Sequence, residues 1–231
     1  YKVTEGEFVK GEKHGNWTIW FDDGSIKGEE SYSNGEMDGQ WTWWTPNGTK
    51  DREGNFKNGV KHGLWVSWNN NDHKKGEETY VNGVLDGLVT IWHDNGNKDR
   101  EGIIRGNEPE GSWTYYFADG TEDFRFDYGS GLDRVRIAEL EERDDLFYKI
   151  GKNKPYTGIV VESGGLKDYL LLGRFQSGRR DGQWVQWYRN GQKEVEGIYQ
   201  RGKKNGMWSL WYEDGTLKEK GEFDMGDIDG T

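Results

Sequence analysis

Four histidines, the residues best suited to metal binding or acid–base chemistry near neutral pH, are spread along the chain: His14, His62, His73 and His93. His14 and His62 occupy the same place in a repeated pattern, 48 residues apart. If each repeat supplies two strands, it advances by about 9 to 10 Å, so these two imidazoles lie too far apart to share an ion. We interpret the histidines as solvated loop residues and expect no metal site.

The acidic segment 224–230 has a faint similarity to a calcium loop. It lacks the terminal bidentate Glu and coincides with a regular glycine link, which favours a turn. The chain shows no Ser-His-Asp set and no phosphate-cradling loop, and its carboxylates fall in turns where solvent screens them. The sequence therefore predicts a protein that is not an enzyme and has neither catalytic residues nor a cofactor.

A Gly-x-Trp-x-x-Trp pattern recurs every 24 residues and must position any functional side chain. Fixed self-similarity of this length indicates stacked supersecondary units. We expect five units in residues 1–126, a degenerate repeat or connector in 127–157, and three units in 158–231. The units begin at Gly15, Gly39, Gly63, Gly87, Gly111, Gly158, Gly182 and Gly206.

Each unit has the signals of a β-hairpin. Residues 17–21 are aromatic and β-branched and run into Asp22-Asp23-Gly24, a turn signal. A second, polar strand follows at about 27–32, and Asn34-Gly35 opens the link to the next unit. Helix is disfavoured by the many glycines. The sequence predicts an all-β fold, an elongated single-layer antiparallel sheet of stacked hairpins that forms a solenoid.

Side chains alternate across a strand, so each unit carries aromatic residues on both faces. The second aromatic of each unit has small or β-branched companions, which suggests a packed structural ladder. This ladder comprises Trp20, Trp44, Trp68, Trp92, Tyr116, Trp187 and Trp211. On the other face the third and fifth strand positions vary, as recognition positions do in repeat proteins. The candidate partner-binding face comprises Ile19, Trp43, Ile91, Tyr115, Leu210, Phe21, Phe117, Tyr188 and Tyr212. The alternative is that these residues only pack against their neighbours.

The rhythm is interrupted in 127–157, yet Gly111 and Gly158 are 47 residues apart, one short of two periods. A degenerate hairpin over this stretch would put Ile137 and Leu140 at the tryptophan positions and a turn at 143–145, with 146–150 as second strand. A short charged helix within 133–143 is the competing interpretation.

Composition limits the partners. A net charge of −11 and a pI near 5.0 argue against nucleic acid and make anionic membrane an unlikely partner, because both need a basic surface. No apolar stretch is long enough to span a bilayer, so we expect a soluble protein and favour a secreted, periplasmic or surface location over a cytoplasmic one. The absence of cysteine fits any compartment. The start at Tyr1 suggests a trimmed or mature chain. Gly230 resembles the start of a further unit, and bare ends invite end-to-end or edge association.

The stretch Gly182-Gln-Trp184-Val-Gln-Trp187-Tyr188-Arg-Asn-Gly191 resembles the core of the MORN repeat family, in particular its bacterial variant repeat. Residues 145–158, followed by two strong repeats, are similar to the opening of YwqK-family antitoxins. The resemblance implies a sheet of hairpins that acts in protein or lipid association. We expect a non-catalytic scaffold for protein–protein interaction, with antitoxin-like neutralisation as a special case. The alternative is a carbohydrate-binding module in which rings such as Trp43 and Tyr115 stack on glycans.

Overall fold

The computed structural model describes residues 3–129, 131–163 and 169–229, whose regular secondary structure is almost entirely β-strand. The helical part of these ranges is one three-residue 3-10 turn, and no helix in them has the length and apolarity needed to cross a bilayer. The sheets are open series of successive antiparallel hairpins, which confirms the predicted fold class. The chain divides into two compact units, Tyr1–Ser130 and Gly131–Thr231, which are described separately. Gly230 lies outside the described residues.

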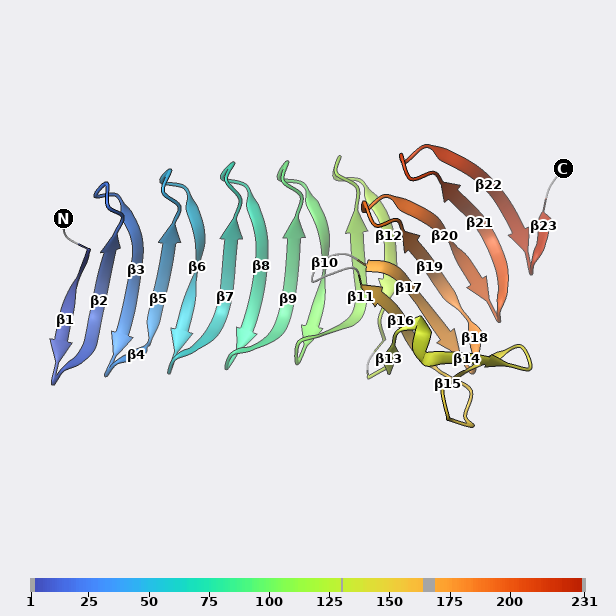
Figure 1. The fold of residues 1–231 in the computed structure, drawn as a ribbon, viewed down its shortest axis with the longest axis horizontal. Coiled ribbons are helices and arrows are strands. Elements are labelled where there is room, and N and C mark those ends of the chain that lie inside the picture. Colours follow the sequence, from blue (N-terminus) through green and yellow to red (C-terminus); the bar gives the residue numbers. More distant parts are fainter. Residues whose placement is uncertain (1–2, 130, 164–168, 230–231) are drawn as a thin grey trace. The chain divides into compact units, whose positions relative to one another are not determined.

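The first unit is a single-layer sheet in which each long strand pairs with the strands before and after it (Figure 1). The short strand β4 pairs antiparallel with the end of β3. The strands are β1 (Thr4–Val9), β2 (Glu12–Trp20), β3 (Ile26–Ser33), β4 (Glu36–Met37), β5 (Gly39–Trp44), β6 (Lys50–Lys57), β7 (Val60–Trp68), β8 (Lys74–Val81), β9 (Val84–Trp92), β10 (Lys98–Arg105), β11 (Glu108–Tyr116) and β12 (Glu122–Asp127).

Two kinds of turn alternate along this sheet. Two-residue links such as Asn58-Gly59 have positive φ at both positions (49° and 77°), as in the type I′ turn that Asn-Gly favours. Longer turns close with a backbone hydrogen bond, as from the Phe21 N–H to the Ser25 carbonyl (2.8 Å). In this turn the hydroxyl and the N–H of Ser25 both donate to Asp23, and these bonds lower the pKa of its carboxyl. The predicted turns therefore form where the sequence places them.

The strands are held in register by an indole seated on a glycine. In β6 the ladder to β7 is interrupted between Glu53 and Asn55, and the Trp65 ring covers Gly54 at this point. A Cβ on Gly54 would overlap the ring. The Trp65 indole N–H donates to the Asn55 carbonyl (3.1 Å), so this carbonyl keeps a hydrogen-bond donor where the ladder is interrupted. The same seat is formed by Gly6 with Trp17, Gly102 with Trp113, Gly173 with Trp184, and Gly197 with Trp208.

Alternate units of the first sheet use a second kind of strand, so the structural period is 48 residues. In β3 and β8 the glycines, Gly28 and Gly76, come two residues before the position of the indole seat. They pair with Trp43 and Ile91. A glutamate occupies the seat position instead, with Glu30 opposite Trp17 and Glu78 opposite Trp65.

The second unit repeats the hairpin pattern in β16 (Gly158–Ser163), β17 (Tyr169–Gln176), β18 (Arg179–Arg180), β19 (Gly182–Trp187), β20 (Lys193–Gln200), β21 (Lys203–Trp211), β22 (Leu217–Asp224) and β23 (Asp227–Asp229). Before them, β13 (Arg134–Val135) pairs with β16 in parallel. This two-residue contact is the exception to the predicted antiparallel arrangement. It arises because the intervening segment is long enough for the chain to return in the same direction.

That intervening segment is a separate hairpin of β14 (Leu140–Arg143) and β15 (Leu146–Lys149). Its turn residues Asp144 and Asp145 both have positive φ, 51° and 61°, as the predicted turn requires. Helix is limited to the 3-10 turn η1 (Ile137–Glu139), where the Glu139 carboxylate accepts the Arg136 N–H (3.0 Å). The helical alternative is thus wrong for most of 133–143, and Ile137 lies in this turn rather than at a tryptophan position on a strand.

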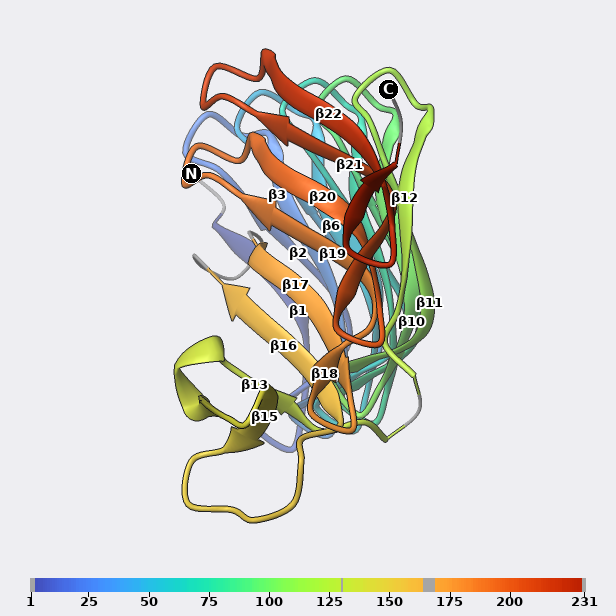
Figure 2. The same ribbon diagram turned by 90° about the vertical axis from the view of Figure 1, so that its right-hand side faces the viewer.

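The connector gives the second unit a second layer. Figure 2 shows η1 and the hairpin standing to one side of the sheet near β16 and β17. Tyr156 and Val135 are buried there against Phe175 and Trp184, with Phe147 packed around them. The sheet face that carries Trp184 is therefore partly covered by the chain itself.

The indole seat predicts a position-specific effect of alanine. Gly54→Ala should lower the free energy of unfolding by about 2 to 3 kcal/mol, because the new Cβ forces the Trp65 ring or the strand to move. Gly76→Ala is the matched control, since its Cβ would meet mainly the movable Ser67 hydroxyl (3.3 Å) and should change stability by less than about 1 kcal/mol. Urea denaturation followed by circular dichroism measures both. Equal losses would contradict the seat.

Candidate functional site

The register assigns each row of side chains to one of two faces. We call the face with Trp17, Trp65 and their equivalents the indole face. The opposite face, with Thr18, Trp20 and their equivalents, is the threonine face. Either face could serve recognition, so the question is which side chains the array leaves free.

The indole face of the first unit is filled by its own side chains. Its first-column tryptophans are 4% to 5% exposed. The rings follow one another in edge-to-face or tilted contacts with centroids 4.9 to 6.5 Å apart. The Lys61 ammonium lies 4.4 Å from the Trp65 ring and 4.6 Å from the Tyr80 ring, and burial lowers its pKa. Lys13 covers Trp17 and Tyr32 in the same way.

The candidate partner-binding face lies in this packing. Ile19, Trp43, Ile91, Leu210, Phe21 and Tyr188 are partly buried, and only Phe117 and Tyr212 in the set are about half exposed. Tyr115 is buried and stacks on Phe124 with centroids 4.5 Å apart. The Trp43 ring contacts both Trp41 and Trp65. As a binding face the set stays a prediction, and most of its members are engaged in the sheet.

The predicted ladder runs along the threonine face at intermediate burial, while the deepest packing belongs to the first tryptophan of each repeat. Between successive ladder rings a lysine bonds the glutamate three residues on, as Lys74 does Glu77 (2.5 Å), and lies over the next ring, here Trp92 (5.7 Å). Lys50 and Lys193 repeat this arrangement with Trp68 and Trp211. The charged side chains between the ladder rings are therefore paired with each other.

Two glutamates on the indole face, one buried and one partly buried, are held by tyrosines two residues away. The Tyr32 hydroxyl donates to Glu30 and that of Tyr80 to Glu78, each at 2.8 Å. Burial, together with these hydrogen bonds, raises the pKa of both phenols. In β12 the glutamate is replaced by Phe126, and Tyr128 instead shares a hydrogen bond with Tyr115 (2.8 Å).

The histidines are structural, and the expectation of solvated loops is wrong for two of them. His14 and His62 lie within β2 and β7 and are half-buried. His73 and His93 bond carbonyls of the neighbouring repeat, Asp94 at 2.8 Å and Tyr116 at 3.1 Å. Asn95 does the same with Ala118, so polar side chains tie successive turns together. Among the described residues no three histidines or carboxylates cluster as metal ligands.

A surface that the sequence analysis missed lies on the threonine face of β7 to β10. Register places Leu64 beside Thr79, Val81 beside Val84, and Leu88 beside Ile103. The aliphatic side chains here are 38% to 57% exposed. We call this set the aliphatic patch: Val60, Leu64, Val81, Val84, Leu88 and Ile103. In the sequence, the signal was that these two repeats carry aliphatic residues at positions where the earlier repeats carry polar ones.

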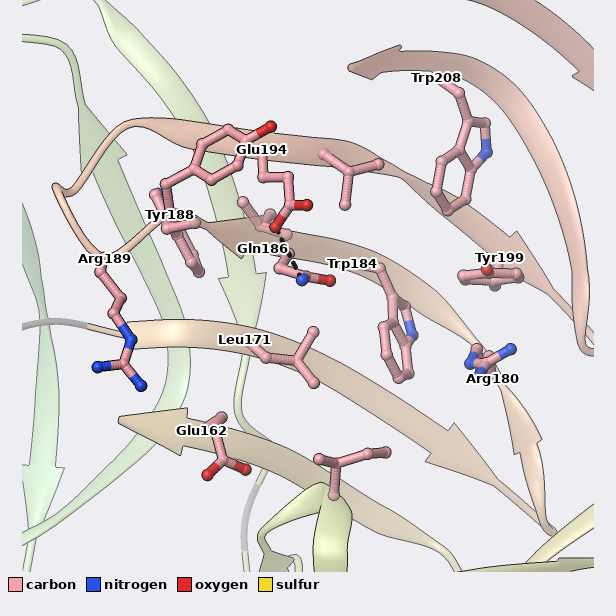
Figure 3. Close-up of a pocket in the computed structure, with 14 residues that line it drawn as sticks. Glu162, Leu171, Arg180, Trp184, Gln186, Tyr188, Arg189, Glu194, Tyr199 and Trp208 are labelled. Atoms are coloured by element: carbon pink, nitrogen blue, oxygen red, sulfur yellow. Dashed lines mark hydrogen bonds between the residues drawn. The ribbon is translucent and has the colours of Figure 1, made fainter. Parts of the chain in front are cut away.

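A groove of about 620 Å³ lies on the indole face of the second unit (Figure 3). Leu171, Trp184 and Val195 line it, together with Ile137 from η1 and Tyr188. Its polar groups are Glu162, Gln186, Glu194, Arg180 and Arg189. The Gln186 amide donates to Glu194 (2.9 Å).

The tyrosine–glutamate pairs, which are partly buried, predict a loss of stability in alkali. Below the ordinary phenol pKa of 10.0, folded and unfolded chains both keep their phenol protons. Above it the unfolded chain releases protons that folded Tyr32 and Tyr80 retain, so stability falls as pH rises. In the variant with Tyr32→Phe and Tyr80→Phe the fall between pH 9 and 11 should be shallower, whereas Tyr212→Phe, at an exposed site, should leave it unchanged. Urea midpoints across this pH range test it, and an unchanged slope in the double variant would contradict it.

Comparison with known proteins agrees with the repeat geometry. The family described as MORN repeat variant matches residues 13–34, 37–58, 180–201 and 204–225. Each match covers a first strand, its turn and a second strand. No curated protein matches the chain. MORN repeats form a non-enzymatic family that generally mediates binding to proteins or membranes. The chain thus contains repeats of the MORN variant type, two in each of its units.

Proposed function

We propose that this protein is a non-enzymatic scaffold that binds a partner protein through the aliphatic patch of its first unit. The repeat family supports a binding role in general. The observation that carries the specific proposal is the patch, six aliphatic side chains gathered on four neighbouring strands and left exposed.

The array itself does not need apolar residues at these positions. The repeats before the patch carry Glu12 and Glu36 where it has Val60 and Val84. They carry Asn16 and Gln40 where it has Leu64 and Leu88. Since those repeats form the same hairpins, the aliphatic side chains add nothing the fold requires, and exposed apolar clusters of this kind mark contact surfaces.

The occupant is an aliphatic surface of another protein. Charged neighbours of the patch are already paired, as Arg105 is with Asp86 (2.8 Å), and the nearby glutamates have lysine partners. Contact therefore depends on apolar burial and only weakly on salt. Covering a few hundred Å² of the patch would contribute on the order of 10 kcal/mol before the costs of association.

Toxin neutralisation, which the YwqK-family resemblance suggests, is one form that such binding could take, with the toxin as partner. The glycan alternative is less well supported, because the Trp43 and Tyr115 rings are packed against other rings instead of presenting open faces.

A double substitution tests the proposal. Leu64→Gln with Leu88→Gln gives the patch the residue that Gln40 supplies in an earlier repeat, so folding should be retained. A photo-crosslinking residue at position 79 should capture a partner from the native host, while the same residue at position 31, its equivalent two repeats earlier, should not. With that partner purified, the double variant should weaken binding at least tenfold, as measured by calorimetry.

Three results would count against the patch. Crosslinking at both positions alike indicates nonspecific capture. Undiminished affinity of the double variant places the contact elsewhere. Concentration-dependent dimers that the double variant abolishes make the occupant a second copy of this chain.

A further inference from the structure

We propose that the groove of the second unit binds an extended peptide segment of a partner protein, with a basic side chain against Glu162, an apolar side chain two residues on, and an acidic one two residues further at Arg180. This site lies in the other unit from the aliphatic patch and does not depend on it. Its argument rests on the order of groups along the groove (Figure 3).

One end of the groove is acidic and has an unmet hydrogen-bonding need. The Glu162 Oε2 atom is buried and has no hydrogen-bond partner among the described residues. Leaving a buried carboxylate oxygen unbonded is costly, so a ligand that brings an N–H donor recovers that cost. Glu194, held by Gln186, adds a second negative charge to the same lining. A lysine or arginine side chain meets both requirements.

The middle of the groove is apolar. Leu171 and Trp184 lie between the acidic end and Arg180. Val195, which pairs with Gln186 on the neighbouring strand, also lines the groove. Leu171 and Val195 are only partly buried and can be contacted by a ligand, whereas Trp184 is 8% exposed. An aliphatic side chain that packs on the apolar part of the groove removes apolar surface from water, which favours binding.

The far end is basic. The Arg180 guanidinium lies over the Phe147, Trp184 and Tyr199 rings at 5.1 to 5.5 Å. Ring contacts hold it but leave its N–H groups to bond an acceptor. Arg189 is exposed beside Tyr188 at the acidic end. Its positive charge reduces the net negative charge of that end.

The spacing fits an extended chain. Leu171 and Phe175 are on one strand, and Phe175 pairs with Arg180, so the acidic and basic ends are four residue steps apart along the sheet. At about 3.3 Å a step this is roughly 13 Å, the distance from residue i to i+4 of an extended peptide. Residues i, i+2 and i+4 of such a peptide point to one side, which matches the order acid, apolar, base in the groove.

The probe that tests this is the capped peptide Lys-Thr-Leu-Thr-Glu, titrated into the whole chain while heteronuclear NMR follows the Trp184 indole N–H. Two peptide controls leave the protein untouched. Norleucine in place of lysine removes the charge and keeps the alkyl stem. Lys-Leu-Thr-Thr-Glu keeps the composition but turns the leucine away from the groove. Each should raise Kd about tenfold.

Glu162→Gln should raise Kd for the lysine peptide by a similar factor, and combined with the norleucine peptide it should cause no further loss, since both changes remove one interaction. Glu219→Gln is the matched control, an exposed glutamate of β22 that does not line the groove and should not alter Kd. The aliphatic-patch double variant should also bind the peptide normally, which separates the two proposals.

The proposal is overturned if the Trp184 signal does not move at millimolar peptide, if norleucine or the rearranged peptide binds as well as the parent, or if the effects of Glu162→Gln and norleucine add. Because the peptide controls use unchanged protein, misfolding of a variant cannot decide the result.

Discussion

The structure depends on an indole lying flat on a strand where a glycine leaves out its Cβ. At each seat the ring fills the space of a missing side chain, and at Trp65, Trp113, Trp184 and Trp208 the indole N–H also donates to a carbonyl of the neighbouring strand. The contact joins two strands through apolar burial and a hydrogen bond together. Because the sheet of the first unit is one layer thick, these seats supply what a second layer supplies in a sandwich.

The two faces of the sheet therefore differ in what they do. On the indole face, lysines and tyrosines complete the packing, as Lys61 and Tyr80 do around Trp65, so little is left for a partner. The threonine face is free to vary, and it turns aliphatic in two repeats. In the second unit the connector covers part of the indole face, and Ile137 from η1 is one of the residues that line the groove. Both proposed contacts thus occur where the repeat's own packing stops.

The hairpins and their turns could be predicted from the sequence, because a 24-residue period and Asn-Gly links fix them locally. The aromatic columns could not be ranked in this way. Trp65 and Trp68 are three residues apart and chemically alike, and only the ladder interruption at Gly54 shows which is buried. The 48-residue alternation was visible in the shifted glycines Gly28 and Gly76 but had no meaning without cross-strand partners. The groove depends on the fold of the connector, whose sequence lacks the repeat signal.

The most direct measurement compares the two tryptophans of one repeat. Trp65→Leu and Trp68→Leu remove equal amounts of side chain from one strand, and urea denaturation gives the loss of unfolding free energy for each. The indole seat predicts a loss of about 3 kcal/mol or more for Trp65→Leu and less than half of that for Trp68→Leu, whose ring is only partly buried. Equal losses, or a larger loss at Trp68, would contradict the account.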